Sequence, residues 1–289
     1  MIYTDRFSLK LKSIFMKKIS FFCILAFLFI AGCTQKKPIE KTILGMGTDY
    51  WLYPETLKGK VKEVKEQNYW AIEKDGKMTK GDLMTWKDLD SIGSTKNFVA
   101  YFDTAGVLTR IDRLDDDNSI RYSSIGIFEN GRCIRMENKL KDSTYSYQIL
   151  EYDNLGYFIG GSYYRPINDT LLSKAVLTHD GKGNYTKIES FNPKNERTSL
   201  RTLTLNNEGK VIDVKFFNKN DSLMANYINT YDDKGFIIRT QSIIENPRST
   251  STWDMKNLAY DDHGNLLECF SNIDDGKYKI MLVRSYIYY

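Results

Sequence analysis

Few residues in this chain are of types that perform nucleophilic, acid–base or metal chemistry. It has two histidines, His179 and His263, and four cysteines, none in a Cys-x-x-Cys spacing. These counts speak against a zinc site, which takes its ligands mainly from Cys and His. The Asp and Glu residues show no spacing that singles out an acid–base pair, and no nucleophile elbow or P-loop is present. We therefore predict no enzyme activity, no cofactor and no metal site.

Cys33 is the cysteine with the clearest chemical role. Met16 and two lysines precede an apolar run over residues 19–30, which is shorter than the roughly 20 residues of a membrane span. Small Ala31 and Gly32 come directly before Cys33, whose thiol suits thioether attachment of a diacylglycerol. This pattern resembles the signal sequence of bacterial lipoproteins. The resemblance predicts a signal region over 1–32, with the true start at Met16, and cleavage before a lipidated Cys33.

Cleavage before Cys33 changes the charge of the protein. Removing five basic residues from 41 and one acidic residue from 37 leaves 36 of each. No basic excess remains to attract nucleic acid. The predicted partner is therefore a membrane, through the anchor, together with a protein or a glycan. The residue after Cys33 is Thr34 and not the Asp that would retain a lipoprotein in the inner membrane, which favours the outer membrane. Residues 35–37 lack an acidic export run, which favours a periplasm-facing orientation over surface exposure.

Two cysteines remain in the mature chain, Cys133 and Cys269. They lie two residues after Gly131 and five after Gly264, so in matching strands they are expected to face opposite sides of a sheet. About five repeats also separate them. We predict two buried thiols and no disulfide between them.

Short turn-like motifs that end in glycine recur at intervals of 25 to 30 residues. β-branched and aromatic residues fill the stretches between them, for example Lys210–Phe217 and Phe236–Ile244, as in β-strands. A second set of Asn-, Asp- and Pro-rich breakers follows each glycine by about ten residues. Each repeat thus predicts two strands and two turns. The glycines are Gly76, Gly106, Gly131, Gly156, Gly183, Gly209, Gly235 and Gly264.

The glycine motifs have the chemistry of tight hairpin turns. An Asp carboxylate can accept the amide two residues on, and the glycine can adopt a positive φ. Calcium binding is disfavoured, because equivalent turns lie two strands apart, about 9.5 Å, whereas calcium ligands lie within about 2.6 Å of the ion. We predict a structural turn role for Asp153, Gly156, Asp180, Gly183, Gly209, Asp232, Gly235, Asp261 and Gly264.

Tyrosines occupy one register position of the repeat. Tyr152, Tyr231 and Tyr260 each precede their glycine by four residues, and His179 stands in an equivalent place. Cross-strand aromatic packing explains such a ladder directly. The functional alternative is a stacked aromatic face that binds a sugar or peptide. We interpret His179 as a substitute for tyrosine in the ladder and not as a base.

Three of the motifs begin with Tyr-Asp and carry a glycine three residues after the Asp, at Tyr152, Tyr231 and Tyr260. They resemble the YD-repeat, or RHS-like, family of bacterial secreted and surface proteins, over residues 97–289. The spacing is longer than the usual repeat of that family, and the arginine that commonly follows the glycine is replaced in all three. The resemblance therefore implies a small lipoprotein of the Bacteroidetes type with degenerate repeats, and not a large toxin-encapsulating shell.

The repeats predict an all-β fold. Eight glycine turns would join up to sixteen antiparallel strands, and open twisted sheets rarely exceed about ten strands without curling or closing. We predict one long antiparallel meander of β-hairpins, about 26 residues per repeat, in a strongly curved or coiled sheet, with a closed β-barrel as the alternative. Asp213, Lys215, Arg239 and Glu268 interrupt the strands and leave no continuous apolar outer band, which speaks against a barrel that spans lipid.

A single domain is predicted, because no internal linker is visible. Residues 33–49 form a tether and residues 50–289 the hairpin-repeat domain. The alternation over Leu57–Glu66 predicts the opening strand. Asp82–Asn97 is the least regular stretch and is interpreted as a short helix or a loop.

Three functional hypotheses remain at this stage. The first is a lipid-anchored β-repeat scaffold of the cell envelope that binds a protein or glycan without catalysis. The second, an accessory or immunity-like partner of a secreted RHS-type toxin, follows from the family resemblance. The third is an envelope polysaccharide hydrolase that uses paired carboxylates.

Overall fold

The computed structural model describes residues 57–289, so Cys33, Tyr50 and the predicted tether lie outside the described part of the chain. Nearly all of the described part is β-strand. The elements are β1 (Val61–Lys74), β2 (Lys77–Leu83), α2 (Trp86–Ser91), β3 (Phe98–Phe102), β4 (Leu108–Leu114), β5 (Ile120–Glu129), β6 (Arg132–Leu140), β7 (Ser143–Tyr152), β8 (Phe158–Arg165), β9 (Thr170–His179), β10 (Tyr185–Phe191), β11 (Arg197–Leu205), β12 (Val211–Asn218), β13 (Leu223–Tyr231), β14 (Ile237–Glu245), β15 (Arg248–Tyr260), β16 (Leu266–Ile273) and β17 (Tyr278–Tyr288), with single 3₁₀ turns at Ile167–Asp169 and Asp274–Gly276.

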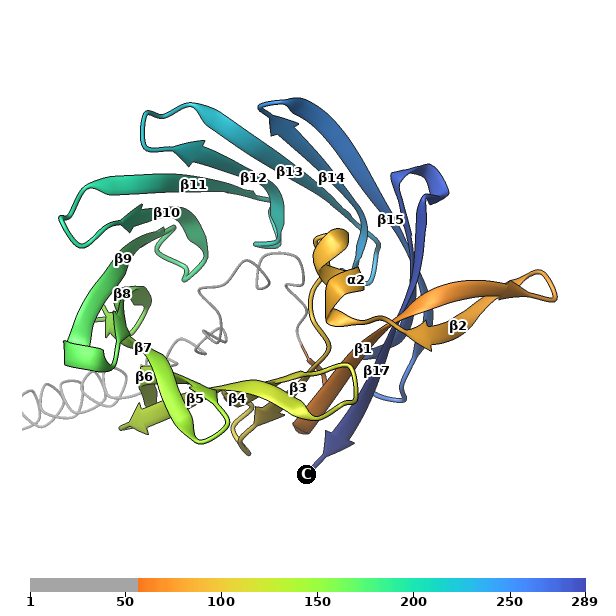
Figure 1. Cartoon of the computed structure of the whole chain (residues 1–289), viewed down its shortest axis with the longest axis horizontal. Coiled ribbons are helices and arrows are strands. Elements are labelled where there is room, and N and C mark those ends of the chain that lie inside the picture. Colours follow the sequence, from red (N-terminus) through yellow and green to blue (C-terminus); the bar gives the residue numbers. More distant parts are fainter. Residues whose placement is uncertain (1–56) are drawn as a thin grey trace, which may run out of the picture. The chain divides into compact units, whose positions relative to one another are not determined.

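The strands close into a barrel. Each strand from β3 to β17 pairs antiparallel with the next, and β17 returns to pair with β1. The first half of β1 pairs with β3, and its second half pairs with β2. Sixteen strands therefore form the ring, and β2 extends β1 as a hairpin beside it (Figure 1). The predicted all-β antiparallel meander is confirmed, and of its two forms the closed barrel is the one present.

One face of the sheet looks into the barrel. Residues directly opposite each other in an antiparallel ladder share a face, so one face can be followed around the ring from pair to pair. On β16 and β17 this face carries Ile273 and Ile280, and Leu89 of α2 packs against both. Figure 1 shows α2 inside the ring of strands. We call this the inner face, and most of the buried residues lie on it.

Charged side chains lie mainly on the outer face, where they form ion pairs along and between strands. Examples are Lys187–Glu189 at 2.9 Å and Arg239–Asp254 at 2.5 Å. A charge at mid-membrane on the lipid side of a barrel costs about 2–4 kcal/mol for Lys or Arg. The four charges that interrupt the strands, Asp213, Lys215, Arg239 and Glu268, all lie on this outer face. These outward charges would therefore be costly in a lipid core. No helix within residues 57–289 is long and apolar enough to cross a membrane.

The barrel has two distinct ends. The turns that contain the repeat glycines from Gly106 to Gly264 gather at one end, which we call the glycine end, whereas the turn of Gly76 between β1 and β2 lies toward the other. The second set of turns lies at the other end together with α2, and we call it the helix end. The indole Nε1 of Trp86 in α2 donates to the carbonyl of Leu114, next to the β4–β5 turn, at 2.7 Å. The two sets of turns predicted from the repeat thus become two rims with different chemistry.

The seam between β1 and β17 is sealed at the glycine end by a side-chain network. Asn265 donates to the carbonyl of Lys58 and to the hydroxyl of Tyr288, each at 2.8 Å. The backbone amide of Lys58 donates back to Asn265 at 2.7 Å, and Tyr288 donates its hydroxyl to Asp261. The residues that precede β1 are thereby joined to a turn more than two hundred positions later in the sequence.

Tyr288 is expected to make the stability of the barrel depend on pH. Burial, followed by its hydrogen bond to Asp261, raises the pKa of Tyr288 from 10.0 to about 12. The folded state then holds this proton more tightly than the unfolded state, so the stabilising contribution is complete below pH 10 and is lost between pH 10 and about 12. In urea unfolding at a series of pH values, Tyr288→Phe should lose less free energy of unfolding across that window than the wild type. An equal loss in both proteins would contradict this prediction.

Cys133 and Cys269 are buried on β6 and β16 and are not joined in a disulfide. The expectation that they face opposite sides is wrong, because both belong to inner-face clusters. The reason is a β-bulge that follows the glycine turns. In β16 the register shifts between Leu266 and Cys269, so the second and the fifth residue after the glycine share a face.

Candidate functional site

The predicted turn residues have the geometry of tight turns at the glycine end. In Asp153 one carboxylate oxygen accepts the amides of Leu155 at 2.9 Å and Tyr157 at 2.8 Å. The same pair of bonds is made by Asp180, Asp232 and Asp261, and Asn206 makes it in the turn of Gly209. The glycines have positive φ in all five turns: Gly156, Gly183, Gly209, Gly235 and Gly264.

The three tyrosines that were candidates for ligand binding differ in what their hydroxyls do. Tyr152 donates to the carbonyl of Cys133 at 2.7 Å, and Tyr231 donates to the carbonyl of Val211 at 2.8 Å. Both therefore tie neighbouring strands together at the glycine end. Tyr260 instead borders a cavity. His179, which we interpreted as a substitute for tyrosine in the ladder, contacts Asp153. Its Nε2 lies 3.1 Å from Oδ2 of Asp153.

Cations stack on the ladder tyrosines, a feature that the sequence analysis missed. Arg132 lies over the ring of Tyr152, 5.8 Å from its centroid, and Lys210 lies over Tyr231 at 5.6 Å. Each of these cations directly follows a repeat glycine. The signal was therefore in the sequence, as a basic residue that recurs after glycine about twenty residues before the next tyrosine.

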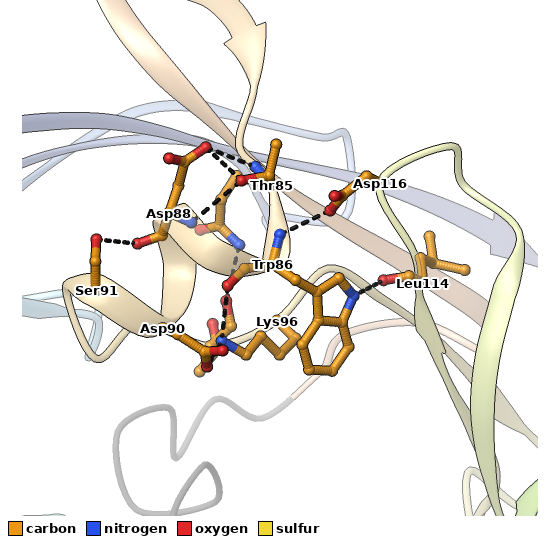
Figure 2. A network of polar contacts seen from close by, with 10 residues as sticks. Thr85, Trp86, Asp88, Asp90, Ser91, Lys96, Leu114 and Asp116 are labelled. Atoms are coloured by element: carbon orange, nitrogen blue, oxygen red, sulfur yellow. Dashed lines mark hydrogen bonds and ion pairs between the residues drawn. The ribbon is translucent and has the colours of Figure 1, made fainter.

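The helix end is shaped by α2, which lies within Asp82–Asn97, the stretch interpreted as a helix or a loop. Thr85 caps the helix in a capping box with Asp88, and the backbone amide and hydroxyl of Thr85 lower the pKa of Asp88. Figure 2 shows Trp86 held by two bonds to the neighbouring hairpin, from its indole to Leu114 and from its amide to Asp116 at 2.7 Å. These two bonds fix α2 to the β4–β5 hairpin at the helix end.

Two cations lie over the ring of Trp86. The ammonium of Lys96 lies 5.0 Å from its ring centroid and the guanidinium of Arg121 lies 4.5 Å from it. Lys96 also donates to Asp90 and to the carbonyl of Trp86, as drawn in Figure 2. These contacts leave the indole embedded in the wall of the opening and hold the first turn of α2 to the strand that carries Arg121.

A buried polar network fastens the α2 segment to the inner face of β1. The side chain of Asn97 accepts the amide of Asn68 at 2.8 Å and donates to the carbonyl of Met84 at 3.3 Å. On the neighbouring strand pair, Arg284 donates to Glu66 at 2.8 Å from both Nε and an Nη. The side chain of Arg284 is 5% exposed and that of Glu66 is 2% exposed. This segment is therefore a fixed part of the barrel interior.

Three tyrosines gather at the helix end next to α2. Tyr122 lies beside Trp86, with ring centroids 6.1 Å apart. Burial, and then the neighbouring phenols of Tyr122 and Tyr163, raise the pKa of Tyr145, which is 46% exposed. These residues come from β5, β7 and β8. We call Tyr122, Tyr145 and Tyr163 the mouth tyrosines, and they form an accessible aromatic surface at the opening.

Beyond the mouth, the inner face carries neutral hydrogen-bonding groups. Most strands of the ring contribute hydroxyl or amide side chains to the inner face. Aromatic rings such as those of Tyr227 and Trp253 lie among them. Its charged residues are few: the buried Glu66–Arg284 pair, Arg113 and Arg201, and burial lowers the pKa of Arg201. The neutral polar residues include Ser124, Asn138, Ser146, Gln148, Ser173, Ser190, Ser199, Asn218, Thr240, Ser242, Ser251 and Ser271.

No group of three or more His, Cys, Asp or Glu within residues 57–289 is placed to hold a metal ion. What the inner face and its mouth can do chemically is to hydrogen-bond and stack against a neutral ligand.

Comparisons with known proteins show no family for this chain. No protein-family model matches it, and no curated protein matches it. A solved porin-like protein from Bacteroides uniformis is 9% identical, with a TM-score of 0.40, and the match covers 80% of this chain and 98% of that one. A porin-like protein from Bacteroides vulgatus is 10% identical over 78% and 98%, with a TM-score of 0.38. The TcdB2-TccC3-Cdc42 structure is 13% identical over 75% and 14%, with a TM-score of 0.33. Likenesses at this level carry no inference about function.

Proposed function

We propose that this protein is a lipid-anchored, non-catalytic binding barrel of the bacterial cell envelope, and that it holds a glycan along its inner face. The observation that supports this most is the division of chemistry between the two faces. The outer face carries most of the charged residues, whereas the inner face carries hydroxyls, amides and aromatic rings among its apolar residues. Sugars present hydroxyls and apolar ring faces, so neutral hydrogen-bonding groups and aromatic side chains are their natural partners.

The anchor at Cys33 and the charged outer face together support attachment to a membrane without insertion into it. Lipid chains hold a protein at a membrane surface, and the barrel wall then remains in water. We place the protein at the outer membrane, because Thr34 and not Asp follows the anchor. We expect it to face the periplasm, because residues 35–37 lack an acidic export run.

Glycan binding should depend on the mouth tyrosines. In calorimetric titrations of the full lipidated protein in detergent against a panel of oligosaccharides, we expect saturable binding to at least one. Tyr163→Ala should weaken that binding by about tenfold, since an aromatic contact contributes on the order of 1 kcal/mol or more.

The matched control is Tyr164→Ala. Tyr164 neighbours Tyr163 on β8 but stacks on Tyr147 of the outer face, with centroids 5.1 Å apart, so this variant should bind as the wild type does. Binding to no oligosaccharide, or equal weakening in both variants, would count against the glycan proposal. Specific capture of one envelope protein in its place would favour a protein partner.

A further inference from the structure

A repeated hydrogen bond ties the two strands of a hairpin together at the glycine end. In each case the hydroxyl of a tyrosine near the end of one strand donates to the carbonyl two residues after the glycine that precedes the partner strand. We call this bond the tyrosine clamp. It lies beyond the last paired residues of the hairpin, where the strands have begun to separate. The clamps are Tyr152 to Cys133 at 2.7 Å, Tyr231 to Val211 at 2.8 Å and Tyr286 to Leu266 at 2.8 Å.

The β14–β15 hairpin departs from this pattern. Its last pair is Arg239 with Asp254, and Tyr260 follows Asp254 by six residues, whereas Tyr231 follows the last paired residue of β13, Ile228, by three. The three additional residues also account for the spacing of 29 between Gly235 and Gly264, against 26 in the two preceding repeats. Within residues 57–289 no clamp joins Tyr260 to Ile237.

A cavity of about 570 Å³ opens where the clamp is missing. Its lining includes Arg239 and Lys256 of the outer face and Met255 and Asn257 of the inner face. The cavity is an open hollow between β14 and β15, which we call the slot. Its volume is in the range of sites that bind small molecules.

The slot contains a hydrogen-bond acceptor that the hairpin does not use. In β13 the equivalent Asn229 donates to Val211 at 3.1 Å and accepts from Thr240 at 2.9 Å. In β15 Asn257 donates instead to Asp232 at 3.1 Å, and Cys269 stands opposite it where Thr240 stands opposite Asn229. The buried Oδ1 of Asn257 has no hydrogen-bond partner. A donor from a ligand would satisfy it.

A cation already occupies the aromatic wall of the slot. The ammonium of Lys234 lies 4.0 Å from the ring centroid of Tyr260, closer than the cations of the other ladder tyrosines. Burial, followed by the charges of Asp232 and others nearby, raises the pKa of Tyr260. The face of an aromatic ring favours an ammonium group at this point.

We propose that the slot between β14 and β15 binds the ammonium group of a small amine, which displaces Lys234 from Tyr260 and donates to Asn257. The site is separate from the inner face on which the proposed function rests. Lys234 acts in it as a tethered competitor that occupies the face of the Tyr260 ring until an amine enters.

The test uses two probes of the same shape, cyclohexylammonium and cyclohexanol, titrated into the full-length protein and followed by calorimetry. The ammonium should bind saturably and the alcohol should not. Lys234→Ala should strengthen ammonium binding by about two- to fivefold, since it removes a competing cation–π contact. Tyr260→Leu should abolish the preference for the ammonium.

The matched control is Lys210→Ala, which removes the equivalent cation from Tyr231 without touching the slot and should leave ammonium affinity unchanged. Thermal unfolding verifies that each variant is folded. Equal binding of the two probes, or a Lys234→Ala variant that binds the ammonium no better than the wild type, would overturn the proposal. Tyr163→Ala should not affect ammonium binding, so a failure of the glycan proposal can be told apart from a failure of this one.

Discussion

Replacing Cys33 with Ser is expected to release the protein completely from the membrane fraction. A hydroxyl cannot take the place of the thiol in thioether attachment, so neither the diacylglycerol nor the cleavage that depends on it should follow. Metabolic labelling with a radioactive fatty acid should give no signal, and the protein should move to the soluble fraction or persist as an uncleaved precursor of greater mass.

Cys23→Ser provides the matched control. Cys23 lies ten residues upstream, within the segment that the sequence analysis assigns to the signal, and this variant should remain labelled and membrane-bound. Fatty-acid incorporation into the Cys33→Ser protein, or its unchanged sedimentation with membranes, would rule out the anchor. It would also remove the membrane as a predicted partner.

Replacing Glu66 with Gln is expected to lower the free energy of unfolding by about 3–5 kcal/mol, the cost of leaving one member of a buried ion pair without its counter-charge. Taken as whole residues, Glu66 is 1% exposed and Arg284 6% exposed. The pair also joins β1 to β17 and receives the hydroxyl of Thr95 from the α2 segment. The substitution therefore affects the seam and the interior at the same point. Urea unfolding at neutral pH, monitored by tryptophan fluorescence, measures the change.

Glu63→Gln is the control for this measurement. Glu63 lies on the same strand but pairs with Ile287 and Tyr101 on the outer face, where removal of one charge changes stability by about 0.5 kcal/mol or less. A loss below about 1 kcal/mol for Glu66→Gln would show that the buried pair does not stabilise the seam.

The approximate number of strands followed from the spacing of the glycines, because a glycine turn and its second breaker are local signals: up to sixteen strands were expected, and the described chain has seventeen. Closure was not predictable in the same way. It depends on the pairing of β1 with β17, and neither Val61–Lys74 nor Tyr278–Tyr288 contains a local feature that names its partner. The alternation of residues along each strand suits both an open coiled sheet and a barrel. Long-range pairing decides between them.

The candidate sites show the same limit. The turn chemistry of Asp153 was readable because all its bonds are local. The side of the sheet on which Cys269 lies was mispredicted, because the prediction assumed strict alternation and a β-bulge shifts the register before Cys269. The slot at Tyr260 has a visible cause in the sequence, the spacing of 29 residues, but its meaning depends on knowing that the shorter repeats of Tyr152 and Tyr231 end in a clamp.

The seam has a consequence for how the chain folds. β1 and β17 are separated by about two hundred residues, so the last contacts of the barrel form between the most distant parts of the described chain. Such non-local pairing makes folding slow. Until it forms, β1 and β16 present long rows of unsatisfied amides and carbonyls, which recruit strands from other molecules. A chain truncated before Tyr278 keeps both of these edges permanently and is expected to aggregate, however complete its remaining hairpins are.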